Sequence, residues 1–91
     1  MKTILITGAT SGFGKAIAYK FAQHGYQLIL NGRREERLRA IETELKEQYG
    51  AKVVTLAFDV SDKKKEKNAI QSLPHDFKKI DVLVNNAGLA A

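Results

Sequence analysis

Aliphatic residues gather in short clusters along the chain, each of a length suited to one strand. The clusters at residues 4–6, 28–30 and 82–84 are each followed within a few positions by glycine or asparagine, residues typical of the turn after a strand. The segment after residue 52 is rich in valine and other apolar residues. We therefore predict strands at residues 3–7, 27–31, 52–59 and 80–85.

The segments between these strands have the three- and four-residue apolar spacing of amphipathic helices. Two clear helices are predicted at residues 12–24 and 35–49, each followed by a glycine that can end a helix in the left-handed conformation. The residues expected on their buried faces are Phe13, Ile17, Ala18, Phe21 and Ala22 in the first helix, and Leu38, Ile41, Leu45 and Tyr49 in the second.

A third, weaker helix is predicted after Ser61 or Asp62, either of which can cap it. It should end near Leu73, because the residue before Pro74 disfavours helical geometry. Strands and helices then alternate as β-α-β-α-β-α-β, which argues for a parallel sheet. Right-handed crossovers give the strand order 3-2-1-4, the N-terminal half of a Rossmann-type, doubly wound α/β fold.

Length and composition narrow the class of protein. A chain of 91 residues suits a single domain with a thin core. It contains no cysteine, which excludes disulfides and thiolate metal sites, and its apolar runs are too short to cross a bilayer. With no leader pattern at its start, we expect a cytoplasmic protein that does not bind membranes. The formal net charge of +5 suggests an anionic partner.

The sequence TGATSGFG at residues 7–14 joins the first predicted strand to the first helix. A sharp strand-to-helix turn exposes backbone N–H groups at the positive end of the helix dipole, which together bind anions. Its spacing, G-x-x-x-G-x-G, differs from the commoner G-x-G-x-x-G, and chance glycines in a plain turn are the alternative. In this turn, Gly8, Gly12 and Gly14 are predicted to let the backbone approach a dinucleotide diphosphate, and Thr10 and Ser11 can add hydroxyl donors.

Arg33 and Arg34 follow the second predicted strand. In this architecture the end of that strand faces the adenosine ribose, where an acidic residue binds the 2′-hydroxyl of NAD and arginine accommodates the 2′-phosphate of NADP. The two arginines therefore favour NADP(H) over NAD. The alternative is that both are solvated residues beside the next helix, although cations are unfavourable at a helix N-terminus.

The ends of the third and fourth strands carry further candidates. Asp59 could accept a hydrogen bond from the adenine amino group, with Val60 against the ring, or Asp59 could simply cap the following turn. After the fourth strand, asparagine side chains can tie neighbouring strand ends together, while small residues let a ligand cross the backbone. The candidates there are Asn86, Ala87 and Gly88.

The remaining charged and polar residues do not indicate a binding site. The lysine-rich run at residues 63–67 is interpreted as the solvated start of a helix, and no aromatic residues interleave with it, so nucleic-acid binding is not expected. His24 and His75 are isolated and lack the spacing of metal ligands.

Taken together, these motifs resemble the short-chain dehydrogenase/reductase family over the whole chain. The resemblance rests on the glycine turn, the arginines after the second strand, Asp59-Val60, and Asn85-Asn86-Ala87-Gly88. It implies a nicotinamide-dependent oxidoreductase whose members are usually homo-oligomers. Residues 8–14, Phe13 among them, would hold the diphosphate, and Asn86 would lie near the ribose. A narrower likeness to the NADP-dependent 3-hydroxy acid (serine-type) dehydrogenases rests on the turn with Phe13, on residues 32–38, on Leu73-Pro74 and on residues 80–90.

This chain departs from the family in one respect. The family's chemistry uses a serine and a Tyr-x-x-x-Lys pair in the later half of longer chains, and no tyrosine here is followed by lysine at that spacing. We therefore expect residues 1–91 to be the N-terminal NADP(H)-binding portion of such an enzyme, acting on an alcohol or ketone only in a full-length form. Alone, the chain should be inactive, marginally stable and prone to associate. A non-catalytic dinucleotide-binding module, a basic nucleic-acid-binding fragment and a site for another Rossmann ligand remain alternatives.

Overall fold

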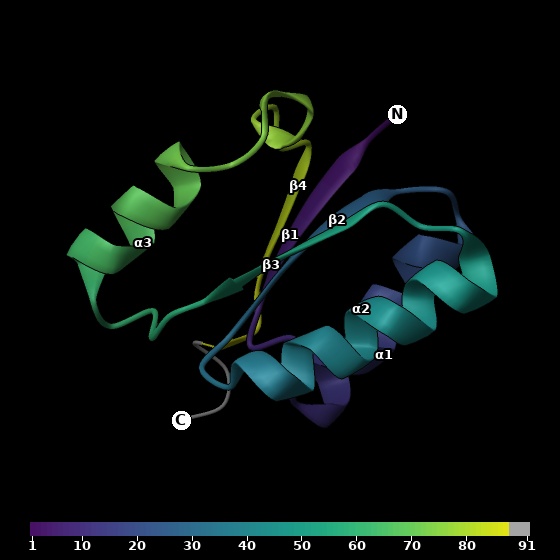
Figure 1. Ribbon diagram of the computed structural model, residues 1–91, viewed down its shortest axis with the longest axis horizontal. Coiled ribbons are helices and arrows are strands. Elements are labelled where there is room, and N and C mark those ends of the chain that lie inside the picture. Colours follow the sequence, from purple (N-terminus) through teal and green to yellow (C-terminus); the bar gives the residue numbers. More distant parts are fainter. Residues whose placement is uncertain (88–91) are drawn as a thin grey trace.

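The computed structural model describes residues 1–87 and confirms the predicted alternation of strands and helices (Figure 1). Gly88 and the residues after it lie outside the described part. The elements are β1 (Thr3–Thr7), α1 (Gly12–Gln23), β2 (Gln27–Gly32), α2 (Glu35–Tyr49), β3 (Val53–Ala57), α3 (Lys63–Gln71), the 3-10 helix η1 (His75–Phe77) and β4 (Val82–Asn85).

The four strands form one parallel sheet in the order β3-β2-β1-β4, as predicted. β1 therefore lies between β2 and β4, with Ile4 beside both Leu28 and Val82. Strands one and four, far apart in sequence, are thus neighbours, and their carboxyl ends meet at one edge of the sheet. Open α/β sheets bind ligands at such an edge.

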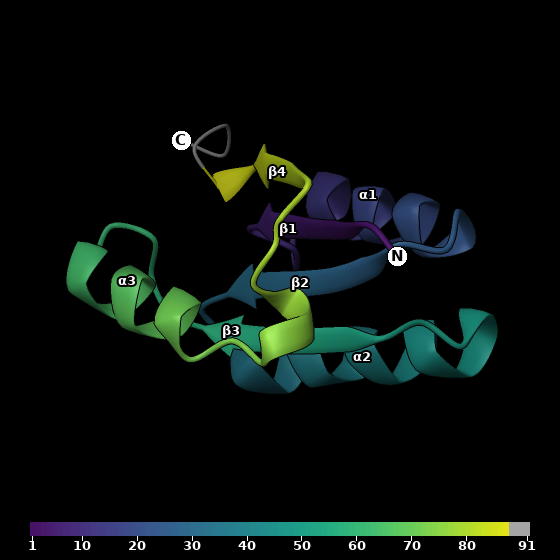
Figure 2. The same ribbon diagram turned by 90° about the horizontal axis from the view of Figure 1, so that it is seen from above.

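One face of the sheet is covered by α1 and α2, as the view from above shows (Figure 2). Alternate strand residues point to this face, because successive side chains of a strand lie on opposite sides. The buried cluster between the sheet and these two helices contains Ile4, Ile6, Ala9, Ala18, Ala22, Leu28, Leu30, Leu38, Ile41, Leu45 and Val53.

Two residues predicted to be buried are exposed instead. The side chain of Phe13 is 80% exposed, because α1 turns Gly14, Ala18 and Ala22 toward the sheet and Phe13 lies about 100° around the helix. Tyr49, 36% exposed, is the last residue of α2 and packs edge-on against Tyr19, with ring centroids 6.3 Å apart.

Several element ends also differ from the prediction. β3 stops at Ala57, two residues early, because Ala57 pairs with Gly32, the last residue of β2. β4 begins at Val82 rather than at residue 80. The Asp81 N–H still donates to the Thr3 carbonyl oxygen at 2.9 Å, but the Thr3 N–H donates to the Asp81 carboxylate at 2.8 Å instead of to a backbone carbonyl of the next strand. After α3, the chain continues through Pro74 into η1, an element that the sequence did not predict.

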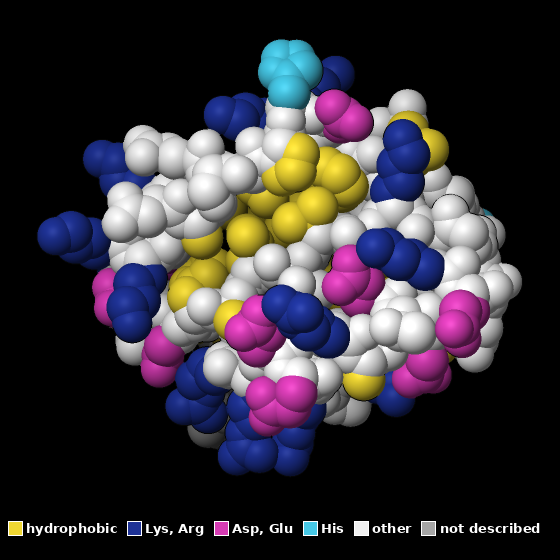
Figure 3. All heavy atoms as spheres, in the orientation of Figure 1, with side chains coloured by type: hydrophobic (Ala, Val, Ile, Leu, Met, Phe, Trp, Pro, Cys, Tyr) yellow, Lys and Arg dark blue, Asp and Glu magenta, His cyan; other side chains and the backbone are white. Residues whose placement is uncertain are grey.

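The opposite face of the sheet is only partly covered. A smaller buried cluster forms there from Leu5, Ile29, Leu73 and Phe77. No residue of α3 is buried, and hydrophobic side chains remain visible between α3 and the sheet (Figure 3). A pocket of about 540 Å³ opens in this region, lined in part by Ile70 and by Leu83, which is 62% exposed.

Within residues 1–87, no helix has the length and apolar character needed to cross a membrane. The same residues hold no group of three or more side chains that could ligate a metal ion.

Candidate functional site

The glycine turn between β1 and α1 has a backbone that few other residues could adopt. Gly8 has a φ of +63°, in the left-handed region that favours glycine. A Cβ on Gly8 would also lie 3.1 Å from backbone atoms of Ala87, so the turn packs closely against the end of β4. Ser11 caps α1, because its hydroxyl oxygen accepts the Gly14 N–H at 3.1 Å.

Gly14 brings α1 close to the turn. A Cβ there would lie 2.2 Å from the Gly8 carbonyl oxygen, a separation that requires the helix to move. Within the described residues, the N–H groups of Gly12 and Phe13 have no hydrogen-bond acceptor. These two donors at the start of α1 are therefore available to an anion.

Asn86 ties the end of β4 to this turn. Its side-chain amide is buried and donates hydrogen bonds to the Gly8 carbonyl oxygen at 2.9 Å and to the Ser11 hydroxyl at 2.8 Å. The Ser11 hydroxyl donates in turn to the Gly8 carbonyl, at 3.0 Å. Because its hydrogen is used in that bond, Ser11 holds the turn in shape rather than presenting a free donor to a ligand.

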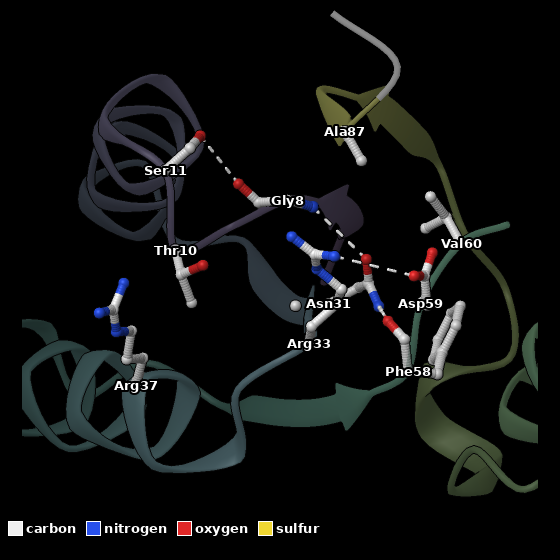
Figure 4. Close-up of a pocket in the computed structure, with 11 residues that line it drawn as sticks. Gly8, Thr10, Ser11, Asn31, Arg33, Arg37, Phe58, Asp59, Val60 and Ala87 are labelled. Atoms are coloured by element: carbon white, nitrogen blue, oxygen red, sulfur yellow. Dashed lines mark hydrogen bonds and ion pairs between the residues drawn. The ribbon is translucent and has the colours of Figure 1, made fainter. Parts of the chain in front are cut away.

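A pocket of about 330 Å³ lies beside the turn, at the carboxyl edge of the sheet (Figure 4). Such a volume is at the lower end of the range for small-molecule sites. Strand ends, turns and the first turn of α2 all contribute to its walls. The lining residues are Gly8, Thr10, Ser11, Asn31, Gly32, Arg33, Arg37, Phe58, Asp59, Val60 and Ala87.

Asn31 is buried at the floor of the pocket. Its amide nitrogen donates to the carbonyl oxygens of Leu56 and Phe58, at 3.1 and 3.0 Å. Its amide oxygen accepts the Gly8 N–H at 3.4 Å. This side chain thus joins the glycine turn to the end of β3, which a hydrophobic residue in this strand could not do.

Asp59 and Arg33 face each other across one side of the pocket, with Nη1 and Oδ2 3.9 Å apart (Figure 4). The other carboxylate oxygen accepts hydrogen bonds from the Ser61 N–H at 2.9 Å and from the Ser61 hydroxyl at 2.8 Å. These bonds first, and the Arg33 charge second, hold the pKa of Asp59 below its ordinary value. Asp59 therefore caps the following turn, as one of the two predicted roles required, and its second carboxylate oxygen is directed at Arg33.

The pocket gathers seven of the residues predicted from the sequence: Gly8, Thr10, Ser11, Arg33, Asp59, Val60 and Ala87. Gly12 and Phe13 lie outside its lining and offer their N–H groups at the turn, while Gly14 and Asn86 support the turn from behind. Arg34 does not line the pocket either, since it precedes α2 as its N-cap residue and is exposed. Gly88 falls outside the described residues.

Comparison with known proteins agrees with this geometry. Residues 2–91 match the family described as short chain dehydrogenase. The chain belongs to that family. Serine 3-dehydrogenase of Rhizobium radiobacter is 52% identical over 88 residues, which are 97% of this chain and 34% of that protein. NADP-dependent 3-hydroxy acid dehydrogenase YdfG of Salmonella typhi is 47% identical over 87 residues, 96% of this chain and 34% of that protein.

Among solved structures, L-sorbose reductase of Gluconobacter frateurii, complexed with NADPH and L-sorbose, superimposes with a TM-score of 0.88. It is 39% identical and covers 96% of this chain, which matches 33% of that one. This short-chain dehydrogenase chain therefore spans about a third of the length of its relatives.

Sequence reasoning missed part of the site of this short-chain dehydrogenase. Asn31 is a polar residue in an otherwise apolar strand, and that contrast was a usable signal for a buried hydrogen-bonding role. Arg37 lies in the first turn of α2 and lines the pocket, whereas the sequence analysis considered only the apolar stripe of this helix. Phe58 also lines the pocket, and nothing in its sequence context marked it.

Proposed function

We propose that residues 1–91 are the N-terminal NADP(H)-binding portion of a short-chain dehydrogenase. The observation that carries the proposal is the meeting of two anion-binding features at one edge of the sheet. The N–H groups of Gly12 and Phe13, which have no acceptor within residues 1–87, lie beside a pocket whose lining contains two arginines and one acid. A ligand with negative charges at two separate points, such as a phosphorylated dinucleotide, fits this pattern.

The residue roles follow from these positions. Gly12 and Phe13 would donate their N–H groups to the diphosphate, and the missing Cβ of Gly8 and Gly14 supports the close packing that shapes the turn. Asp59 and Val60, on the pocket wall opposite the turn, would contact the adenine. Asn86 is buried behind the turn, so contact between Asn86 and the ribose would require its amide to give up a bond to Gly8 or Ser11.

For the whole enzyme we propose hydride transfer between NADP(H) and an alcohol or ketone, with 3-hydroxy acids as the substrate class. The bound nicotinamide would supply or accept the hydride, and these 91 residues would hold and orient the adenosine and diphosphate ends. They contain no Tyr-x-x-x-Lys pair, so the proposal assigns them no proton transfer. Cytoplasmic location and homo-oligomer formation belong to the same proposal and rest on the family.

The test is a calorimetric titration of the 91-residue chain with NADPH and with NADH. We expect NADPH to bind more tightly, because the 2′-phosphate adds charge-assisted hydrogen bonds to arginine. Replacing Arg33→Asp should abolish that preference. If neither NADPH nor NADH binds, the proposed function is overturned. If the unmodified chain binds both equally, the choice of NADP(H) is overturned.

A further inference from the structure

The described part of the chain holds one arginine in the pocket that no acidic side chain neutralises. Arg37 lines the pocket, and no carboxylate lies within ion-pair distance of it in residues 1–87. By contrast, Arg33 pairs with Asp59, and Arg39, on the same helix, pairs with Glu35 at 2.7 Å. Of the two arginines that line the pocket, Arg37 is thus the one without an acidic partner among residues 1–87.

The position of Arg37 in α2 is electrostatically unfavourable for a cation. Arg37 is the third residue of the helix, close to the positive end of the helix dipole, where a cation is mildly unfavourable. The side chain extends from α2 toward Thr10 (Figure 4). A bound anion between these two groups would remove the unfavourable charge interaction.

The surroundings of Arg37 leave room for a small anion. Arg37 and Thr10 also line a neighbouring hollow of about 200 Å³ between the α1 and α2 segments. Glu44 borders that hollow, but its carboxylate is held by the Tyr19 hydroxyl and lies 3.9 Å from the Lys15 ammonium. The pocket and the hollow therefore meet at Arg37 and Thr10.

Gly32 sets how close Thr10 comes to this position. A Cβ on Gly32 would lie 3.2 Å from the Thr10 methyl group, so glycine leaves space for Thr10 to pack there. In the close-up, the Thr10 hydroxyl points toward the side of the pocket where Arg33 lies (Figure 4). No partner within residues 1–87 uses that hydroxyl.

We propose that Arg37, with the Thr10 hydroxyl beside it, is a specificity-determining contact for a phosphate on the adenosine ribose. The inference rests on the proposed function and adds a residue of α2 to the role for which the sequence analysis predicted Arg33 and Arg34. The phosphate lies between the guanidinium groups of Arg33 and Arg37. Arg33 must share its charge with Asp59, whereas Arg37 contributes its whole charge.

The experiment titrates the 91-residue chain with 2′,5′-ADP and with 5′-AMP, which differ only in the 2′-phosphate. For Arg37→Gln we expect 2′,5′-ADP to bind about 10- to 100-fold more weakly, the range for lost charge-assisted hydrogen bonds, with 5′-AMP affinity unchanged. Arg39→Gln is the matched control, since it removes the same charge from the same helix, outside the pocket lining, and should change both affinities less than about twofold.

The outcomes separate the two proposals. If the unmodified chain prefers 2′,5′-ADP and Arg37→Gln keeps that preference, the role of Arg37 is overturned while the proposed function stands. If Arg37→Gln weakens both ligands equally with unchanged circular dichroism, Arg37 acts on the site in general and the inference is again overturned. If the unmodified chain binds neither ligand, both proposals are overturned.

Discussion

The two faces of the sheet differ in how fully they are covered, although the same strands form both. On one face, α1 and α2 bury a continuous aliphatic cluster that includes Leu30 and Leu38. On the other face, α3 contributes no buried residue, and the buried cluster consists of four side chains. The helical elements above each face, rather than the strands below, account for this difference.

The two walls of the candidate site differ in the same way as the two faces of the sheet. The glycine turn and Arg37 belong to α1 and α2, the helices with the larger buried cluster. Asp59 and Val60 belong to the segment that leads into α3 on the less covered face. One wall of the pocket is therefore anchored in the main core, and the opposite wall is held mainly by local hydrogen bonds such as those from Ser61 to Asp59.

The largest expected effect comes from deleting volume on the covered face. Leu30 is fully buried against α1 and α2, so Leu30→Ala should lower the free energy of unfolding by about 2–5 kcal/mol. Leu83→Ala removes the same atoms on the other face, where the side chain is 62% exposed. This substitution should change the free energy of unfolding by less than about 0.5 kcal/mol. Urea denaturation followed by circular dichroism measures both; comparable losses would contradict the contrast between the faces.

A smaller effect is expected where α1 approaches the glycine turn. Gly14→Ala places a Cβ 2.2 Å from the Gly8 carbonyl oxygen, and the resulting overpacking should cost about 1–3 kcal/mol. Gly12→Ala is the matched control, because a Cβ there meets nothing within 4 Å and should stabilise the chain by up to about 1 kcal/mol. Urea midpoints of the two variants test this, and a Gly14→Ala protein as stable as Gly12→Ala would mean that the close approach is not required.

The smallest effect concerns pH and the contact between α1 and α2. Burial first, and the hydrogen bond to Glu44 second, raise the pKa of Tyr19 to about 12. The folded protein then keeps a proton that the unfolded chain loses near pH 10, so this contribution to stability is complete below pH 10 and falls as the pH rises toward 12.

Tyr19→Phe removes that titration, and its free energy of unfolding should decline less between pH 10 and 11 than that of the unmodified chain. Glu44→Gln should reduce the decline in part, because burial of Tyr19 remains. Urea titrations at pH 9, 10 and 11 measure the slopes. If the free energy of unfolding declines equally with pH in all three proteins, the pKa of Tyr19 is not raised.

Much of the fold was predictable because local patterns and tertiary packing agree. The apolar clusters of β1, β2 and β4 mark strands that have neighbours in the sheet, and α2 carries both its periodic stripe and the left-handed Gly50 at its end. Phe13 was misplaced because the three- and four-residue spacing allows more than one rotation of α1. The sheet, which needs Gly14 close to Gly8, selects the rotation that exposes Phe13.

The sequence by itself determined the strand order, the strand-to-helix glycine turn, and the presence of basic residues after β2, since these depend on local spacing and on the handedness of crossovers. Only the tertiary structure decided which basic residues line the pocket. Arg34 and Arg37 differ little as sequence, but the direction in which α2 leaves β2 puts Arg37 in the pocket and leaves Arg34 outside it. Local spacing predicts that Leu38, Ile41 and Leu45 are buried, but only their packing against the sheet fixes the direction of the helix.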